Sequence, residues 1–197
     1  ITISFLLGSL AIFSQNNVCF TVEANPNSSD AALSGFTKHI KVLDCFEIYA
    51  EPGLSDAQVL HAAAIAAELL DNDEDGVIDD INIYNQLIAN QALMPLFSAE
   101  GSSAENTFRN NYNGSGVSAV LYSAEVDPNN PGFWGMDATV EEIMHTINSV
   151  GHVNAYPLAF SLAANSSLMS TAMDTARGGQ FISIPNPYPS AAWYHYD

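Results

Sequence analysis

Carboxylates alternate along the segment DNDEDGVIDDIN, residues 71–82. Hard cations such as Ca²⁺ take several oxygen ligands at about 2.4 Å, and side chains two residues apart in a curved loop can point at one ion. Gly76 permits the sharp turn that such a loop needs. The spacing therefore predicts a calcium site. Its expected ligands are Asp71, Asp73, Asp75, Asp79 and the backbone carbonyl of Val77.

The segment resembles the calcium loop of EF-hand proteins, position by position from Asp71 at position 1 to Asp79 at position 9. The resemblance implies a helix on each side of the loop. It departs from the pattern at position 12, where Asn82 replaces a bidentate glutamate. Unless Asp80 or a residue from elsewhere substitutes, this loss predicts a weak site, with a dissociation constant of roughly 0.1 to 1 mM. The alternative is an acidic surface loop between two helices.

A second group of chemically capable residues lies in DATVEEIMHTINSVGH, residues 137–152. Glu141 and His145 are four residues apart, so on a helix they lie about one turn apart and can close on one metal ion. Glu142, beside them, is a candidate general base.

This segment resembles the zinc helix of the metzincin metallopeptidases, whose pattern is HExxHxxGxxH. In that resemblance Glu141 stands at the first ligand, Glu142 at the general base and His145 at the second ligand. Gly151 occupies the third ligand position and His152 follows it. The implied zinc ligands are Glu141, His145 and His152, with Glu142 taking the proton of the zinc-bound water.

The resemblance carries two further expectations. Met169, in SSLMST, would form the methionine turn beneath the metal, and Asp174 is an alternative third ligand. An unbroken helix would hold His145 and His152 roughly 10 Å apart, too far for one zinc ion with bonds near 2 Å. A zinc site therefore requires the helix to break within residues 148–151.

The alternative for this segment is a structural helix. Thr139 and Glu142 have the spacing of a capping box, and glutamates in a first turn are favoured by the helix dipole alone. An apolar stripe at helical spacing predicts one buried face, formed by Val140, Ile143, Met144, Ile147 and Val150.

The remaining chain indicates the elements that position these residues. A β-branched and aromatic run predicts a strand over residues 39–49. The pair Ser55 and Gln58 predicts the start of an alanine-rich buried helix. Within that helix, His61 is expected to be a satisfied core residue. A second helix is expected over residues 81–92. Residues 92–99 form an apolar run of strand length, although Pro95 argues against a central strand. Residues 99–116 are expected to be loop and residues 117–126 a strand.

These elements predict an α/β fold with a small mixed sheet, a helix pair flanking the acidic loop and a zincin-like central helix. We expect a truncated signal peptide at residues 1–14, a linker or N-terminal extension at residues 15–35, and a single globular domain over residues 36–197 that is incomplete at its C-terminus. The apolar run at the start is too short for a membrane span. A secreted chain would permit a disulfide between Cys19 and Cys45 and glycans on the sequons at Asn27, Asn113 and Asn165.

The formal net charge is −18, with four lysines and arginines against 22 carboxylates. Such a chain is repelled by nucleic acid and anionic membranes, so neither is an expected partner. Two functions are expected from the sequence. One is a secreted zinc-dependent, metallopeptidase-like protein with bound calcium, slow or inactive, acting on a peptide or protein. The alternative is a non-catalytic secreted calcium-binding module in which the EEIMH helix is structural.

Overall fold

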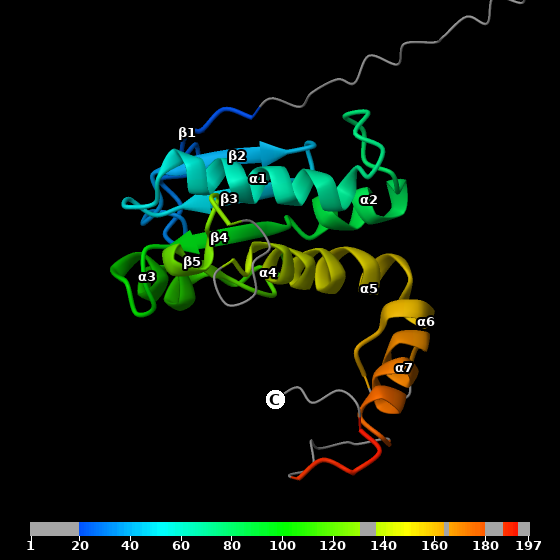
Figure 1. Ribbon diagram of the computed structural model, residues 1–197. Helices are drawn as coiled ribbons and strands as arrows, with labels where there is room; N and C mark the ends of the chain where they lie inside the picture. The colour runs from blue at the N-terminus through cyan, green and yellow to red at the C-terminus, as the bar shows by residue number, and fades with distance from the viewer. Residues whose placement is uncertain (1–19, 131–136, 164–165, 180–186, 193–197) are drawn as a thin grey trace, which may run out of the picture.

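The computed structural model describes residues 20–130, 137–163, 166–179 and 187–192, and within them five strands form one mixed sheet (Figure 1). The strands follow sequence order across the sheet. The first three pair antiparallel, and the third, fourth and fifth pair parallel. They are β1 (Glu23–Ala24), β2 (Lys38–Val42), β3 (Phe46–Ala50), β4 (Leu93–Phe97) and β5 (Leu121–Tyr122). Parallel neighbours need crossover connections, which here contain helices, and the expected α/β class with a mixed sheet is confirmed.

The single strand expected over residues 39–49 is wrong, because β2 and β3 form a hairpin there. Cys45 donates its N–H to the carbonyl of Val42 at 3.1 Å, and Leu43 and Asp44 both have positive φ, at 44° and 58°. Two such residues make a turn whose twist matches a hairpin. Aspartate tolerates this conformation but leucine seldom adopts it, so the sequence carries no ordinary turn signal.

Two helices connect β3 to β4. Helix α1 (Asp56–Leu70) begins with the expected capping box between Ser55 and Gln58, and its alanine-rich side is buried. Helix α2 (Ile81–Ala89) begins where expected and ends three residues before the predicted boundary. The expected helix pair around the acidic loop is therefore present.

Strand β4 lies inside the sheet in spite of Pro95. Along a strand the backbone groups point alternately to the two neighbours. Residues 92 and 96 accept hydrogen bonds from β3 and its extension, whereas Leu93 points the other way and donates to the carbonyl of Gly116. Pro95 therefore directs its nitrogen toward β5, whose pairing with β4 begins only at Leu96. The missing N–H falls where the ladder has no partner for it.

Residues 99–116, expected to be loop, contain α3 (Ser103–Asn111). Ser102 caps it by accepting the N–H of Glu105 at 3.1 Å, and Glu105 reaches back to the N–H of Gly101 at 2.6 Å. The polar composition hid a capping signal at the start of a mostly exposed helix.

The strand expected over residues 117–126 is mostly wrong, since only Leu121 and Tyr122 join the sheet and Ser123–Glu125 form the short helix η1. The hydroxyl of Thr146 accepts the N–H groups of Ser118 and Ala119 at 3.4 and 3.3 Å. A side chain of the following helix thus binds donors that a longer strand would have paired with β4.

The last part of the described chain is helical. Helix α4 (Thr139–Thr146) continues without interruption into the π-helix η2 (Ile147–His152) and into α5 (Val153–Ala155). Helices α6 (Pro157–Phe160) and α7 (Leu168–Ala176) follow and extend away from the sheet (Figure 1).

Two cores lie on the two faces of the sheet. On one face α1, α2, α4 and η2 pack against even-numbered residues of β2 and β3, such as Ile40 and Ile48. On the other, an aromatic cluster of Phe36, Tyr49, Phe97 and Phe108 joins α3 to the N-terminal segment. Residues 20–35, expected as a linker or extension, contain β1 and bury Ala32 and Leu33 in this second core, so the described part of that segment packs with the domain.

Candidate metal centre

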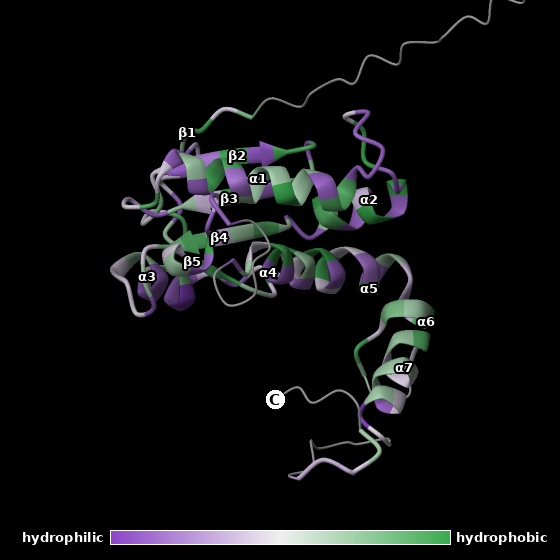
Figure 2. Cartoon of the chain, in the orientation of Figure 1, coloured by the Kyte–Doolittle hydropathy of each residue, from purple (hydrophilic) through white to green (hydrophobic). Residues whose placement is uncertain are grey.

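The acidic loop begins and ends on backbone hydrogen bonds to α1. Asp71 donates its N–H to the carbonyl of Ala67 at 2.8 Å, which completes the last turn, and Asp79 donates to Leu70 at 3.0 Å, which brings the far end of the loop back. Glu74 and Gly76 have positive φ, at 57° and 86°, so the chain reverses between these ends. The loop is the hydrophilic segment between α1 and α2 in Figure 2.

Asp71 organises the turn. It is buried, and its two carboxylate oxygens accept the N–H of Asp75 at 3.1 Å and of Gly76 at 2.7 Å. A buried carboxylate needs such donors, and these two are free because the reversed chain makes no helix or strand there. Position 1 of the loop therefore shapes the backbone besides offering oxygen to an ion.

Three of the four predicted carboxylates meet. One oxygen from each of Asp71, Asp73 and Asp79 lies within 4.8 Å of the others, and this trio could hold a metal ion. In the described part of the chain, no other set of three or more acidic, histidine or cysteine side chains has that geometry. The three are brought together by the loop closure at Asp79 and the turn at Gly76.

The fourth carboxylate has a different role. Asp75 accepts the N–H of Val77 at 2.8 Å and lies outside the trio. Its negative charge is the main reason that the pKa of Asp73 is raised. Asp79 differs, because hydrogen bonds from the Asn72 side chain and backbone lower its pKa. The neighbouring carboxylates therefore repel the charge of Asp73, and a bound cation would relieve this repulsion.

The end of the loop is held by a residue that the sequence did not point to. Tyr156 donates its hydroxyl proton to Asp80 at 2.7 Å and accepts from the Asn82 amide at 2.9 Å. Asp80 also caps α2 by accepting the N–H groups of Asn82 and Ile83, and the hydrogen bond from Tyr156 is the main cause of its lowered pKa. Tyr156 lies 74 residues beyond Asn82, so no local pattern could have revealed it.

The proposed zinc helix begins differently from the capping-box prediction. Thr139 lies inside α4, which begins after Ala138 without a side-chain cap from that residue. Asp137 accepts the N–H and the hydroxyl of Thr139, and its second oxygen contacts Nε2 of His61 at 3.0 Å. His61 is thus the satisfied core histidine that was expected. The sequence analysis assigned no role to its partner Asp137, an acid two residues before the first residue of α4.

The apolar stripe is partly confirmed. Ile143, Ile147 and Val150 are buried, whereas Val140 and Met144 are 41% and 39% exposed. Glu141 and His145 are about half exposed and their nearest charged atoms are 3.9 Å apart. Burial raises the pKa of Glu142, with smaller effects from His145, Glu141 and Glu125.

The helix break that a zinc site requires within residues 148–151 does not occur. The chain passes through those residues as η2 and remains helical to Ala155. Gly151 is buried against α2, where an added Cβ would lie 2.9 Å from Cγ2 of Ile83. His152 packs its ring on Phe160 with centroids 4.8 Å apart. Within the described residues, Glu141, His145 and His152 accordingly form no three-ligand group.

The downstream zincin features also differ from expectation. Met169 lies in α7, in place of the expected methionine turn. Ser167 caps that helix by accepting the N–H of Ser170 at 3.1 Å, so the serines around Met169 begin a helix. Asp174 lies on the same helix and is buried, and it joins no metal-ligand group among the described residues.

Of the two cysteines, Cys19 lies outside the described residues, as does the predicted signal peptide. Cys45 is buried at the β2–β3 turn, and burial raises the pKa of its thiol to about 12. Their disulfide stays a prediction.

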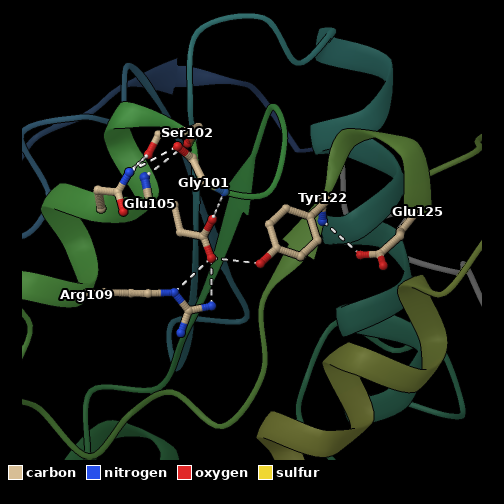
Figure 3. A network of polar contacts seen from close by, with 7 residues as sticks. Gly101, Ser102, Glu105, Arg109, Tyr122 and Glu125 are labelled. Carbon is tan, nitrogen blue, oxygen red and sulfur yellow. Dashed lines mark hydrogen bonds and ion pairs between the residues drawn. The ribbon is translucent and has the colours of Figure 1, made fainter.

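A second polar cluster lies between α3 and β5 (Figure 3). Glu105 is buried and accepts hydrogen bonds from Tyr122 at 2.7 Å, Arg109 at 2.8 Å and the N–H of Gly101 at 2.6 Å. Burial opposes ionisation of Glu105, but these donors outweigh it and lower its pKa. Both of its oxygens are used within the protein, so the cluster joins α3 to β5.

No family model, no curated protein and no solved structure matches the chain. Within the described residues, no helix combines the length and the apolar character that crossing a membrane requires. The function must therefore be argued from the residues of the site.

Proposed function

We propose that the chain is a non-catalytic calcium-binding module in which the ion, held by Asp71, Asp73 and Asp79, rigidifies the connection between α1 and α2. The observation that carries the proposal is the convergence of these three carboxylates in a loop that already has the spacing of an EF-hand. Three carboxylate oxygens are hard ligands and suit Ca²⁺ better than a softer metal such as zinc.

The site is expected to be weak. Position 12 holds Asn82, which offers one amide oxygen in place of a bidentate carboxylate, and its amide nitrogen is bound to Tyr156. Asp75 is bound to Val77. A dissociation constant of roughly 0.1 to 1 mM follows from the reduced ligand charge, as in extracellular calcium modules.

Calorimetric titration and thermal unfolding test the proposal. Calcium at ten times its dissociation constant should stabilise the native state by about 1.4 kcal/mol, or roughly 3–6 °C for a chain of this size. Addition of a chelator should reverse the shift. Asp73→Asn should remove most of this shift, whereas Glu68→Gln, which removes the same charge from an exposed position on α1, should not. A melting temperature unmoved by several millimolar calcium would refute the proposal.

Zinc-dependent peptide hydrolysis stays an untested prediction from the sequence. Elemental analysis of protein purified without chelators separates the two functions. One equivalent of zinc that is lost in His145→Ala would support the peptidase, and zinc content unaffected by that substitution would count against it.

A further inference from the structure

A hollow of about 540 Å³ lies on the face of the sheet opposite α1. Helix α3 and the N-terminal segment cover part of this face through Phe108 and Phe36, and the hollow occupies the part near the β2–β3 turn. Its volume is within the range of small-molecule sites. Walls come from segments distant in sequence, namely residues 27–33, the β2–β3 hairpin, residues 87–93 and residues 111–114.

The sheet supplies a carboxylate and a cation to this hollow. Glu47 and Lys41 are directly opposite each other on β3 and β2, but they make no ion pair within 4.0 Å in the described part of the chain. Glu47 is held on one oxygen only, because His39 at 3.1 Å and Tyr49 at 2.5 Å both contact Oε2. The hydrogen bond from His39 is the main cause of its lowered pKa, so Glu47 is ionised at neutral pH.

Oε1 of Glu47 therefore remains to bind something else. The side chain is 34% exposed, which leaves this oxygen reachable while much of the group is shielded from water. A charged acceptor in such a setting attracts a cation more strongly than a fully solvated carboxylate does.

The rest of the lining favours a cation as well. Asp30 and Asp44 add two carboxylates, so the hollow has three acids against one base, Lys41, which is exposed. Side-chain amides add carbonyl acceptors suited to an ammonium group. An apolar part of the lining would cover a hydrocarbon body. The amides are Gln91 and Asn111, and the apolar part is Leu33, Leu93 and Tyr112.

We infer that this hollow binds a small organic cation, a primary ammonium group on an apolar or aromatic body, with the ammonium on Oε1 of Glu47. The site is independent of the proposed calcium loop, which lies at the opposite end of α2 from Gln91 and Leu87. Lys41 competes with the ligand for Glu47 and limits the affinity.

A matched pair of probes tests the inference on the full chain. Phenethylammonium and 2-phenylethanol share a ring and a two-carbon tether and differ in the charged group. Titration followed by calorimetry and by NMR shifts of Leu93 and Tyr112 should show binding of the cation at least about tenfold tighter than that of the alcohol. Equal binding of the two probes would overturn the inference.

Two substitutions give the expected opposite effects. Glu47→Gln keeps the shape and should weaken phenethylammonium binding about tenfold. Lys41→Gln, on the exposed side of β2, should tighten it roughly two- to threefold, and it tests the inference even if Glu47→Gln fails to fold. Glu68→Gln, on α1 across the sheet, removes one negative charge far from the hollow and should leave the affinity unchanged. Unaltered affinity in Lys41→Gln would show that the ammonium group does not lie beside Glu47, and an equal loss in Glu68→Gln would show that only the overall negative charge attracts the probe; either result would overturn the inference.

Discussion

The hydroxyl of Tyr156 and the carboxylate of Asp80 are joined by a hydrogen bond of 2.7 Å, which links the end of α5 to the residue that caps α2. The same hydroxyl accepts from Asn82, so one side chain from the C-terminal half holds positions 10 and 12 of the acidic loop. The geometry of the loop exit thus depends on a segment outside the loop.

Tyr156→Phe should lower the free energy of unfolding by about 1 to 2 kcal/mol, because it removes one hydrogen bond to a charged group and one to an amide. Asp80 has a lowered pKa in the folded protein, so its contribution to stability is present above the unfolded pKa and is lost as pH falls through the folded pKa. The stability difference between wild type and variant should therefore shrink on acidification.

Urea unfolding at several pH values measures this effect. Tyr84→Phe is the control, since Tyr84 lies on α2 and its hydroxyl makes no hydrogen bond in the described part of the chain. An equal loss of stability in both variants would indicate a packing effect.

Gly151→Ala should destabilise the protein by about 1 to 3 kcal/mol, because the new methyl group would lie 2.9 Å from Cγ2 of Ile83 and both elements are packed. Ile83→Ala removes that methyl group, so the double variant should lose less than the sum of the two single losses. Denaturant unfolding of all four proteins completes the cycle. Strict additivity would show that the close approach of η2 to α2 is not the cause.

Glu105→Gln should cost about 1.5 kcal/mol at neutral pH, since the neutral amide replaces a buried acceptor of three hydrogen bonds. The share of Arg109 is small because its side chain is 58% exposed and water screens its charge. The lowered pKa of Glu105 means that the wild-type advantage is complete above about pH 4.3, the usual glutamate value, and disappears as pH falls through the folded pKa.

Thermal unfolding between pH 7 and pH 3 measures the advantage of Glu105. The matched control is Glu100→Gln, an exposed neighbour. A difference between wild type and Glu105→Gln that persists unchanged at pH 3 would contradict the assigned ionisation.

Asp73→Asn should weaken calcium binding more than Asp75→Asn does, by about tenfold or more against a few-fold, because only Asp73 belongs to the converging trio. The two variants have the same net charge and differ by two positions, so calorimetric titration compares them directly. Equal losses would indicate that Asp75 leaves Val77 to ligate the ion.

The same pair of residues has a pH signature when calcium is removed by a chelator. The raised pKa of Asp73 means that its charge lowers stability as pH rises through that value. Asp75→Asn removes the charge that mainly raises the pKa of Asp73. The free energy of unfolding of this variant, measured relative to wild type, should therefore be higher at pH 7 than at pH 3. Thermal unfolding in chelator gives the comparison.

The parts of the fold that the sequence predicted correctly are those with local signals. Ser55 and Gln58 form the predicted reciprocal hydrogen bonds of a capping box within one helical turn. The carboxylate oxygens of Asp71, Asp73 and Asp79, whose spacing predicted a metal site, lie close together. The errors have physical causes of longer range. Leu43 adopts a turn conformation against its preference, and Thr146 captures the donors of residues 118 and 119 from a distant helix.

The zinc helix illustrates the same limit. Glu141 and His145 have ligand spacing, but the third ligand depends on whether the chain bends after Asn148. The chain continues there as a helix, with Gly151 packed close to Ile83. A motif match specifies which side chains share a turn, whereas convergence of three ligands depends on the path of the backbone afterwards.

The π-helix η2 affects the direction in which the side chains of the following residues, including Tyr156, point from the helix axis. A π turn holds an additional residue relative to an α turn, so it changes the direction in which later side chains leave the helix axis. If the same residues were wound as an ordinary α-helix, the following residues would be rotated by about 100° around the axis. Tyr156 would then no longer face Asp80. The π winding of η2 thus sets the angle at which the C-terminal half meets the acidic loop.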